Sequence, residues 1–167
     1  MSVTTILLTV ALLAANAFFV GAEFAAMSAR RSQLEPLAEA GSKRAQTALD
    51  AMQHTGILLA TCQLGITVCS VLLGAISEAA LHHALTPLFT GLGLSPVVAD
   101  VVALGLALGL IVFLHVVYGE MIPKNISIAR PERSALALVP PLVMVSKVVA
   151  PIIHAMDWLS KALIRLF

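Results

Sequence analysis

Residues 101–119 read VVALGLALGLIVFLHVVYG, a stretch in which His115 is the single ionisable side chain. The hydrocarbon core of a bilayer is about 30 Å thick, so a helix of roughly 20 apolar residues crosses it. This stretch therefore predicts a membrane-spanning helix. Two other stretches have the same character: residues 3–27, where Glu23 is the only charge, and residues 56–77, which carry none.

The composition of the whole chain agrees with three spans. Of its 167 residues, 59% are apolar and 11% are charged, whereas a soluble domain is about 25% charged. A chain this short cannot bury so much apolar surface in a core of its own. This excludes an ordinary soluble enzyme, a disordered segment and a nucleic-acid binder. We expect one all-α transmembrane domain over residues 1–167, in contact with membrane lipid.

Two further segments differ from the spans. Residues 134–156 are apolar but contain Lys147 and the prolines 140, 141 and 151. Because prolines interrupt helices, we expect a kinked, partly re-entrant or belt helix there. Residues 28–54 are polar and compatible with helix, with a break at Gly41. They predict cytosolic helices against the membrane face, and the alternative is a solvated connector.

The basic residues predict the orientation of the chain. Cytoplasmic loops of membrane proteins carry an excess of Lys and Arg. Residues 77–100 contain neither, so we expect a loop over residues 78–100 that faces outside, whereas the other connections are basic. We therefore place the N-terminus outside the cell and the C-terminus in the cytoplasm, in the plasma or inner membrane. The basic residues are Arg30, Arg31, Lys43 and Arg44 before the second span, and Lys124, Arg130 and Arg133 after the third.

Polar residues inside the predicted spans are candidates for function, because an acid at the centre of a membrane helix costs about 2.5–3.5 kcal/mol. Glu23 is such an acid, and Asn16 and Val20 share its helical face. The alternative for Glu23 is a packed structural acid that is protonated or paired with a lysine.

The second span carries a polar stripe. Its oxygen atoms suit either hydrogen bonds between helices or the coordination of a hard cation. For Ser70 and Ser77, packing between helices is at least as good an explanation as cation binding. Gln63 and Thr67, on either side of Gly65, are the stronger ligand candidates. The stripe consists of Gln63, Thr67, Ser70, Gly74 and Ser77.

The third span ends in the sequence GEMIPK, residues 119–124. Pro123 has no N–H group and clashes with the carbonyl four residues earlier, which belongs to Gly119. Inside a membrane this carbonyl must find a donor, a water or a cation, and the Glu120 carboxylate lies beside it. The alternative is a helix that ends at the interface, with Glu120 paired to Lys124. His115 is a proton-linked group or, as we favour, a satisfied core histidine.

Four segments resemble one known family, the transmembrane domain of the CorC/cyclin-M (CNNM) proteins. The resemblance implies a dimer, three spans with a kinked belt helix, and a role in magnesium efflux or homeostasis, not enzymatic activity. It also implies a cytosolic pair of CBS modules beyond this chain. The segments are NAFFVGAEF (16–24), RRSQLE (30–35), ATCQLGIT (60–67) and GEMIPKN (119–125).

The resemblance also implies a largely dehydrated magnesium ion among the three spans. Glu120 and Gly119 match the family motif, while Thr67 stands where many members have Asn. At first-helix positions where members have Ser, this chain has Val20, which cannot ligate, and Asn16, which can. Such a site would rely on carbonyls, Gln63 or retained water, or it would favour sodium or protons over magnesium. The predicted ligands are Glu120, Gly119, Thr67, Gln63 and Asn16, and the other functional candidates are Glu23, Pro123, Lys124, Gly65, Ser70 and Ser28.

Three functions follow from these patterns. The leading hypothesis is a dimeric domain that moves magnesium out of the cell. The first alternative is a membrane anchor and sensor that regulates magnesium through partner proteins. The second is a sodium- or proton-coupled carrier in which Glu23 and His115 titrate. No catalytic set supports an intramembrane protease.

Overall fold

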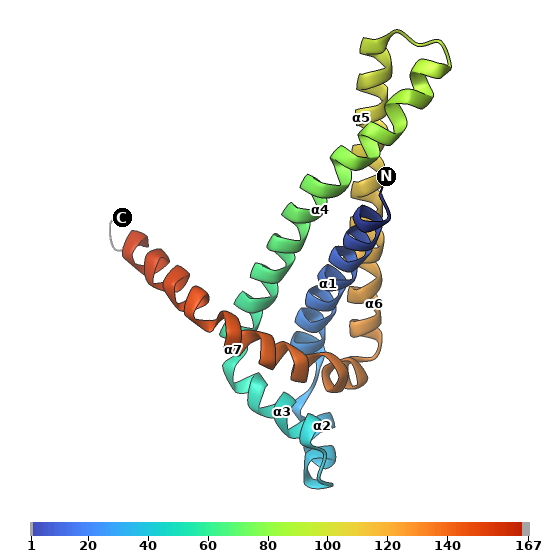
Figure 1. Cartoon of the computed structure of the whole chain (residues 1–167). Coiled ribbons are helices and arrows are strands. Elements are labelled where there is room, and N and C mark those ends of the chain that lie inside the picture. The colour runs from blue at the N-terminus through green and yellow to red at the C-terminus, as the bar shows by residue number, and fades with distance from the viewer. Residues whose placement is uncertain (1, 165–167) are drawn as a thin grey trace. The chain divides into compact units, whose positions relative to one another are not determined.

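The structure is a computed structural model that describes residues 2–164. Every regular element in these residues is a helix, which confirms the predicted all-α fold (Figure 1). The elements are α1 (Val3–Ser28), α2 (Arg31–Glu39), α3 (Lys43–Ala51), the 3₁₀ turn η1 (Met52–His54), α4 (Thr55–Gly91), α5 (Pro96–Leu114), the π-helical segment η2 (His115–Met121), α6 (Ile122–Ala129) and α7 (Pro131–Ile164).

Within residues 2–164, four helical stretches are long and apolar enough to cross a membrane. The chain is therefore a multi-pass membrane protein. Three of the stretches contain the predicted spans, and the fourth contains the predicted belt helix, whose position in the membrane stays a prediction. The stretches are Val3–Ser28, Lys43–Gly91, Pro96–Ala129 and Pro131–Ile164.

The chain divides into two compact units. Unit 1 consists of Met1–Ala17 and Ile66–Pro123, and unit 2 consists of Phe18–Gly65 and Lys124–Phe167. The boundaries fall inside α1, α4 and α6, so each unit is built from pieces of the same long helices.

In unit 1, α4 extends beyond the predicted end of the second span. The sequence predicts a loop over residues 78–100, but α4 stays helical to Gly91 and α5 begins at Pro96. The expected loop was wrong because residues 78–86 are rich in Ala and Leu, which are strong helix formers. The turn itself depends on Gly93, whose φ of +89° suits glycine.

In unit 2, two short helices form the segment between the first two spans. α2 ends at Glu39, Gly41 takes a φ of +91°, and α3 begins at Lys43. This confirms helices with a break at Gly41, because a left-handed residue cannot continue a helix. α3 packs against α7 (Figure 1), and the buried side chains between the short helices and α7 include Leu34 and Leu142.

α7 accommodates three prolines, at positions 140, 141 and 151, in one continuous helix. Figure 1 shows that it changes direction along its length, as expected for a proline-containing helix.

Elsewhere in unit 2, α6 contacts α1 through the buried Ser127, whose hydroxyl donates to the Gly21 carbonyl at 2.8 Å. The Lys124 ammonium lies 4.8 Å from the centre of the Phe24 ring.

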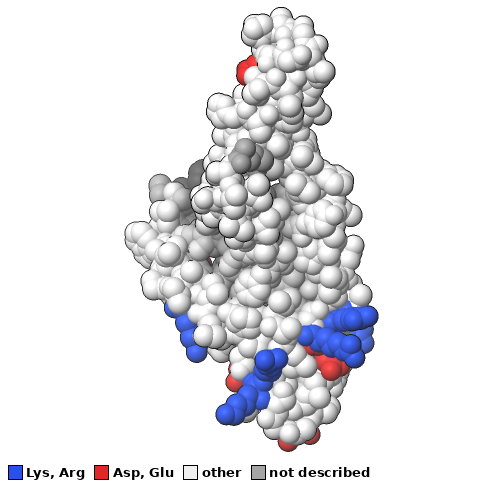
Figure 2. Space-filling view, turned by 45° about the vertical axis from the view of Figure 1, so that its right-hand side comes forward, with Lys and Arg blue, Asp and Glu red and all other residues white. Residues whose placement is uncertain are grey.

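The charges are distributed unequally between the units. All ten Lys and Arg residues belong to unit 2, so the sequence of unit 1 contains none. On the face drawn in Figure 2, Lys and Arg gather in the lower part of the picture. Unit 1 contains three acids, Glu78, Asp100 and Glu120, so its charged side chains, histidines aside, are all negative.

Gly65 permits close contact between α4 and α1 in unit 2. A Cβ atom at this position would lie 2.6 Å from the Phe19 ring, well inside van der Waals contact. Gly74, farther along α4, has open space where its Cβ would be. Gly65 is therefore a packing residue.

We predict that Gly65→Leu destabilises the protein by about 1–3 kcal/mol through overpacking, whereas Gly74→Leu has little effect. Thermal unfolding of both variants in detergent measures the difference. Adding Phe19→Ala to Gly65→Leu removes the obstructing ring and is expected to recover part of the loss. Equal stability of the two single variants would show that the contact does not limit packing.

Candidate functional site

Asn16 is a buried polar residue of unit 1. Its side chain is fully buried on α1, and its Nδ2 donates to the Gly119 carbonyl at 3.0 Å. This carbonyl is the one that Pro123, four residues later, cannot bond. The sequence predicts that it needs a partner, and the structure supplies an amide donor from another helix.

The backbone around Gly119 is π-helical over His115–Met121, and it continues directly into α6. The alternative interpretation, in which the helix ends here, was therefore wrong, because the chain stays helical through Pro123. A π-helix bonds residues five apart, and here the N–H of Ile122 donates to the Val117 carbonyl. The helix therefore continues through this wider turn, although Pro123 has no N–H group to donate.

The π-helical segment also brings His115 and Glu120 together. On an α-helix, residues five apart point roughly 140° away from each other. Here His115 Nε2 lies 3.8 Å from Glu120 Oε1. The Glu120 carboxylate remains 45% exposed, so it is accessible to an ion.

Ser70 on α4 connects these groups. Its hydroxyl lies 3.1 Å from His115 Nε2 and 3.5 Å from Asn16 Oδ1. Side chains and backbone of three helical elements thus form one polar network inside the membrane-crossing part of the chain. We define the polar network as Asn16, Ser70, His115, Gly119 and Glu120.

One more polar contact joins α1 and α4 in unit 1. The buried hydroxyls of Thr9 and Ser77 lie 2.7 Å apart, and Thr9 also donates to the Thr5 carbonyl. The stripe on α4 therefore includes two interhelical contacts, at Ser70 and Ser77. These are the two positions at which the sequence allowed packing between helices as an alternative to cation binding.

The other candidates are placed as follows. Thr67 is exposed on α4 within unit 1, one turn before Ser70. Pro123 is the last residue of unit 1. The remaining candidates belong to unit 2: Gln63, Gly65, Glu23, Ser28 and Lys124.

The polar network contains one carboxylate. Residues 2–164 contain no cluster of three or more His, Cys, Asp or Glu side chains that would hold a metal ion. A cation here would therefore be bound by carbonyl, amide and hydroxyl oxygens together with Glu120. Hard cations such as magnesium and calcium take oxygen ligands of these types.

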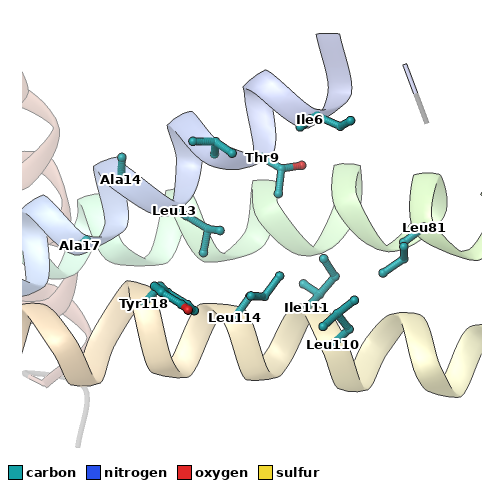
Figure 3. A pocket seen from close by; sticks show the side chains of 11 residues that line it. Ile6, Thr9, Leu13, Ala14, Ala17, Leu81, Leu110, Ile111, Leu114 and Tyr118 are labelled. Carbon is teal, nitrogen blue, oxygen red and sulfur yellow. The ribbon is translucent and has the colours of Figure 1, made fainter. Parts of the chain in front are cut away.

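The large pocket of unit 1 has a different character. It has a volume of about 590 Å³, and its lining is almost entirely apolar side chains of α1, α4, α5 and η2. Figure 3 shows Leu13, Ile111 and Leu114 around it, with the Thr9 hydroxyl and Tyr118 as its polar groups. A bare cation would lose its hydration there without compensation, so the polar network is the better candidate for an ion site.

His115 is the residue whose role the sequence underestimates. It contacts both Ser70 and Glu120, so it is a satisfied histidine that also belongs to the candidate site. Its spacing of five from Glu120 suggests no contact on an α-helix. A glycine followed by a proline four residues later was the available signal for an irregular turn.

Comparison with known proteins gives one family. The profile described as "Cyclin M transmembrane N-terminal domain" matches residues 7–167. An uncharacterized protein of Mycobacterium tuberculosis, Rv1841c, is 43% identical over 98% of this chain and 46% of its own length. The UPF0053 protein YhdT of Bacillus subtilis is 37% identical over 99% of this chain and 36% of its own. The chain thus spans less than half the length of these relatives.

We predict that Asn16→Leu destabilises the protein by about 1–3 kcal/mol, because it leaves the buried Gly119 carbonyl unpaired. Asn125→Leu, the same change at an exposed residue of α6, is the matched control. Denaturant unfolding in detergent measures both.

A double-mutant cycle tests the origin of this effect. Pro123→Ala restores the N–H group that can bond the Gly119 carbonyl, so Asn16→Leu is expected to cost less in that background. If the two substitutions add without coupling, the proline is not the reason for the Asn16 contact.

Proposed function

We propose that this chain, which belongs to the cyclin M transmembrane N-terminal domain family, moves magnesium ions across the cell membrane. The family is linked to divalent cation transport. The observation that carries the proposal is the polar network, in which a backbone carbonyl, an amide, a hydroxyl and a carboxylate meet inside apolar helices. Polar groups in such helices are costly and mark ion pathways.

The proposed ligands are those that the sequence predicts. Glu120 provides the anionic oxygen, and the Gly119 carbonyl, Asn16 and Thr67 provide neutral ones. Gln63 is the fifth proposed ligand. In the absence of an ion, Asn16 Nδ2 bonds the carbonyl. Cation binding would require the Asn16 amide to turn, so that its oxygen and the carbonyl face the ion together.

The charge of unit 1 supports a cation as the substrate. Its sequence contains no Lys or Arg, so no Lys or Arg side chain of unit 1 repels an ion at the polar network. In a medium of low dielectric constant such repulsion would act strongly. We propose that the direction of transport is outward. The proposed orientation places the N-terminus outside the cell and the C-terminus in the cytoplasm.

The proposal includes a homodimer and a cytosolic CBS pair in the longer protein. Gly105 and Gly109 of α5 are exposed and have open space beside them. Small residues at this spacing permit close approach of another helix. The competing function is a membrane anchor and sensor, in which the polar network only holds the helices together.

We predict that the purified chain binds magnesium saturably and that Glu120→Gln weakens this binding at least roughly tenfold. Even residues that merely support ligands change metal affinity by about 10–100-fold. Calorimetry measures the affinity, with calcium and sodium as competitors. Glu78→Gln, an acid of unit 1 outside the polar network, is the control and is expected to bind normally.

The same variants in proteoliposomes test transport. With a magnesium-sensitive dye inside, the wild type and Glu78→Gln are expected to carry magnesium and Glu120→Gln is not. Binding that Glu120→Gln leaves unchanged would rule out this site. Binding without transport would favour the anchor and sensor, and transport that requires a sodium gradient would favour the coupled carrier.

A further inference from the structure

Unit 2 contains a cavity where α4 begins. It has a volume of about 430 Å³ and lies among α3, η1, the first turn of α4 and the middle of α7. We call it the interface pocket. Neither the polar network nor the proposed ligand set includes any of its residues.

Two opposite charges line the interface pocket. Asp50 comes from α3 and Lys147 from α7. Neither side chain takes part in an ion pair or hydrogen bond with another residue between 2 and 164. His54 also lines the pocket, but its Nδ1 contacts the main-chain oxygen of Asp50, so the Asp50 carboxylate keeps its capacity for a ligand.

The rest of the lining is largely apolar. Ile57 and Leu58 begin the apolar stretch of α4, and Val143 and Ala150 come from α7. α3 precedes the apolar stretch and carries charged side chains, so the pocket lies where the chain passes from polar helices into the membrane-crossing stretch. A ligand that fits has a polar end with both charges and an apolar end.

We propose that the interface pocket binds a phospholipid with a primary-amine headgroup, of the phosphatidylethanolamine class. The Lys147 ammonium pairs with the lipid phosphate, and the Asp50 carboxylate accepts hydrogen bonds from the lipid ammonium. The upper part of an acyl chain packs on Ile57 and Val143. This binding does not depend on magnesium transport.

The charge pair selects among lipids. Phosphatidylglycerol has a phosphate for Lys147 and hydroxyl donors for Asp50, but it has no cation, so the charge of the Asp50 carboxylate stays uncompensated beside an anion. Phosphatidylcholine carries a quaternary ammonium, which has no N–H group to donate and is larger. Phosphatidylethanolamine alone of the three offers both side chains a hydrogen-bonding group of opposite charge.

The test is native mass spectrometry of the purified chain with equal amounts of phosphatidylethanolamine, phosphatidylglycerol and phosphatidylcholine of identical acyl chains. The wild type is expected to retain phosphatidylethanolamine about two- to fivefold over the others, the range for exposed charge pairs. Asp50→Asn is expected to remove the preference over phosphatidylglycerol. Lys147→Gln is expected to lower retention of all three lipids, and Lys147→Arg to restore it.

Two control variants remove one charge of the same sign as the pocket variants do, but at positions outside the pocket: Lys43→Gln on α3 and Glu39→Gln on α2. Both are expected to behave as the wild type. Equal retention of the three lipids, or a preference that Asp50→Asn leaves intact, would overturn the proposal. A change of oligomeric state in the pocket variants, without any change in lipid retention, would assign the pocket to a second copy of the chain and would also overturn it.

Discussion

The missing N–H group of Pro123 is the constraint on which unit 1 depends. In water an unpaired carbonyl is solvated at little cost, but within a bilayer it costs several kcal/mol. The Gly119 carbonyl therefore has to be paired by another helix, and Asn16 of α1 pairs it. The other end of the same amide faces Ser70 of α4, so one backbone defect determines which faces of three helical elements meet.

The second consequence of this defect is the geometry of the site. The π-helical turn brings His115 and Glu120 to one side of the helix. Gly119 lacks the Cβ that would lie 3.0 Å from both Asn16 Nδ2 and His115 Cδ2, which allows Asn16 to reach the carbonyl. Irregular helical turns of this type recur at functional sites, and here the turn brings polar oxygen atoms close to the one carboxylate of the polar network.

Much of the fold was predictable because its signals are local. Apolar stretches of sufficient length identify the membrane-crossing helices, and Gly41 separates α2 from α3 as expected. The need of the Gly119 carbonyl for a partner also follows from Pro123 alone. The sequence alone does not predict how the backbone responds to this proline. An unwound helix and a π-helical turn are both compatible with a proline at position 123, and tertiary contacts decide between them.

The same limit explains the other differences. The extension of α4 to Gly91 was not predicted because a proline usually ends or kinks a helix, whereas α4 continues through Pro87. His115 was underestimated because its contact with Glu120 exists only in the π-helical register. Residues that depend on regular periodicity were predictable, and residues that depend on an irregular turn were not.

A single carboxylate in the polar network limits the cation binding that we propose for it. A divalent ion beside Glu120 alone leaves a net positive charge in a medium of low dielectric constant, which is costly. Neutral oxygens and retained water would reduce this cost but not remove it, so we expect a modest affinity. Tight binding would require more carboxylates, as in calcium buffers. An ion that crosses a membrane must also leave its site, so weak binding by one acid and several neutral oxygens suits transport better than storage.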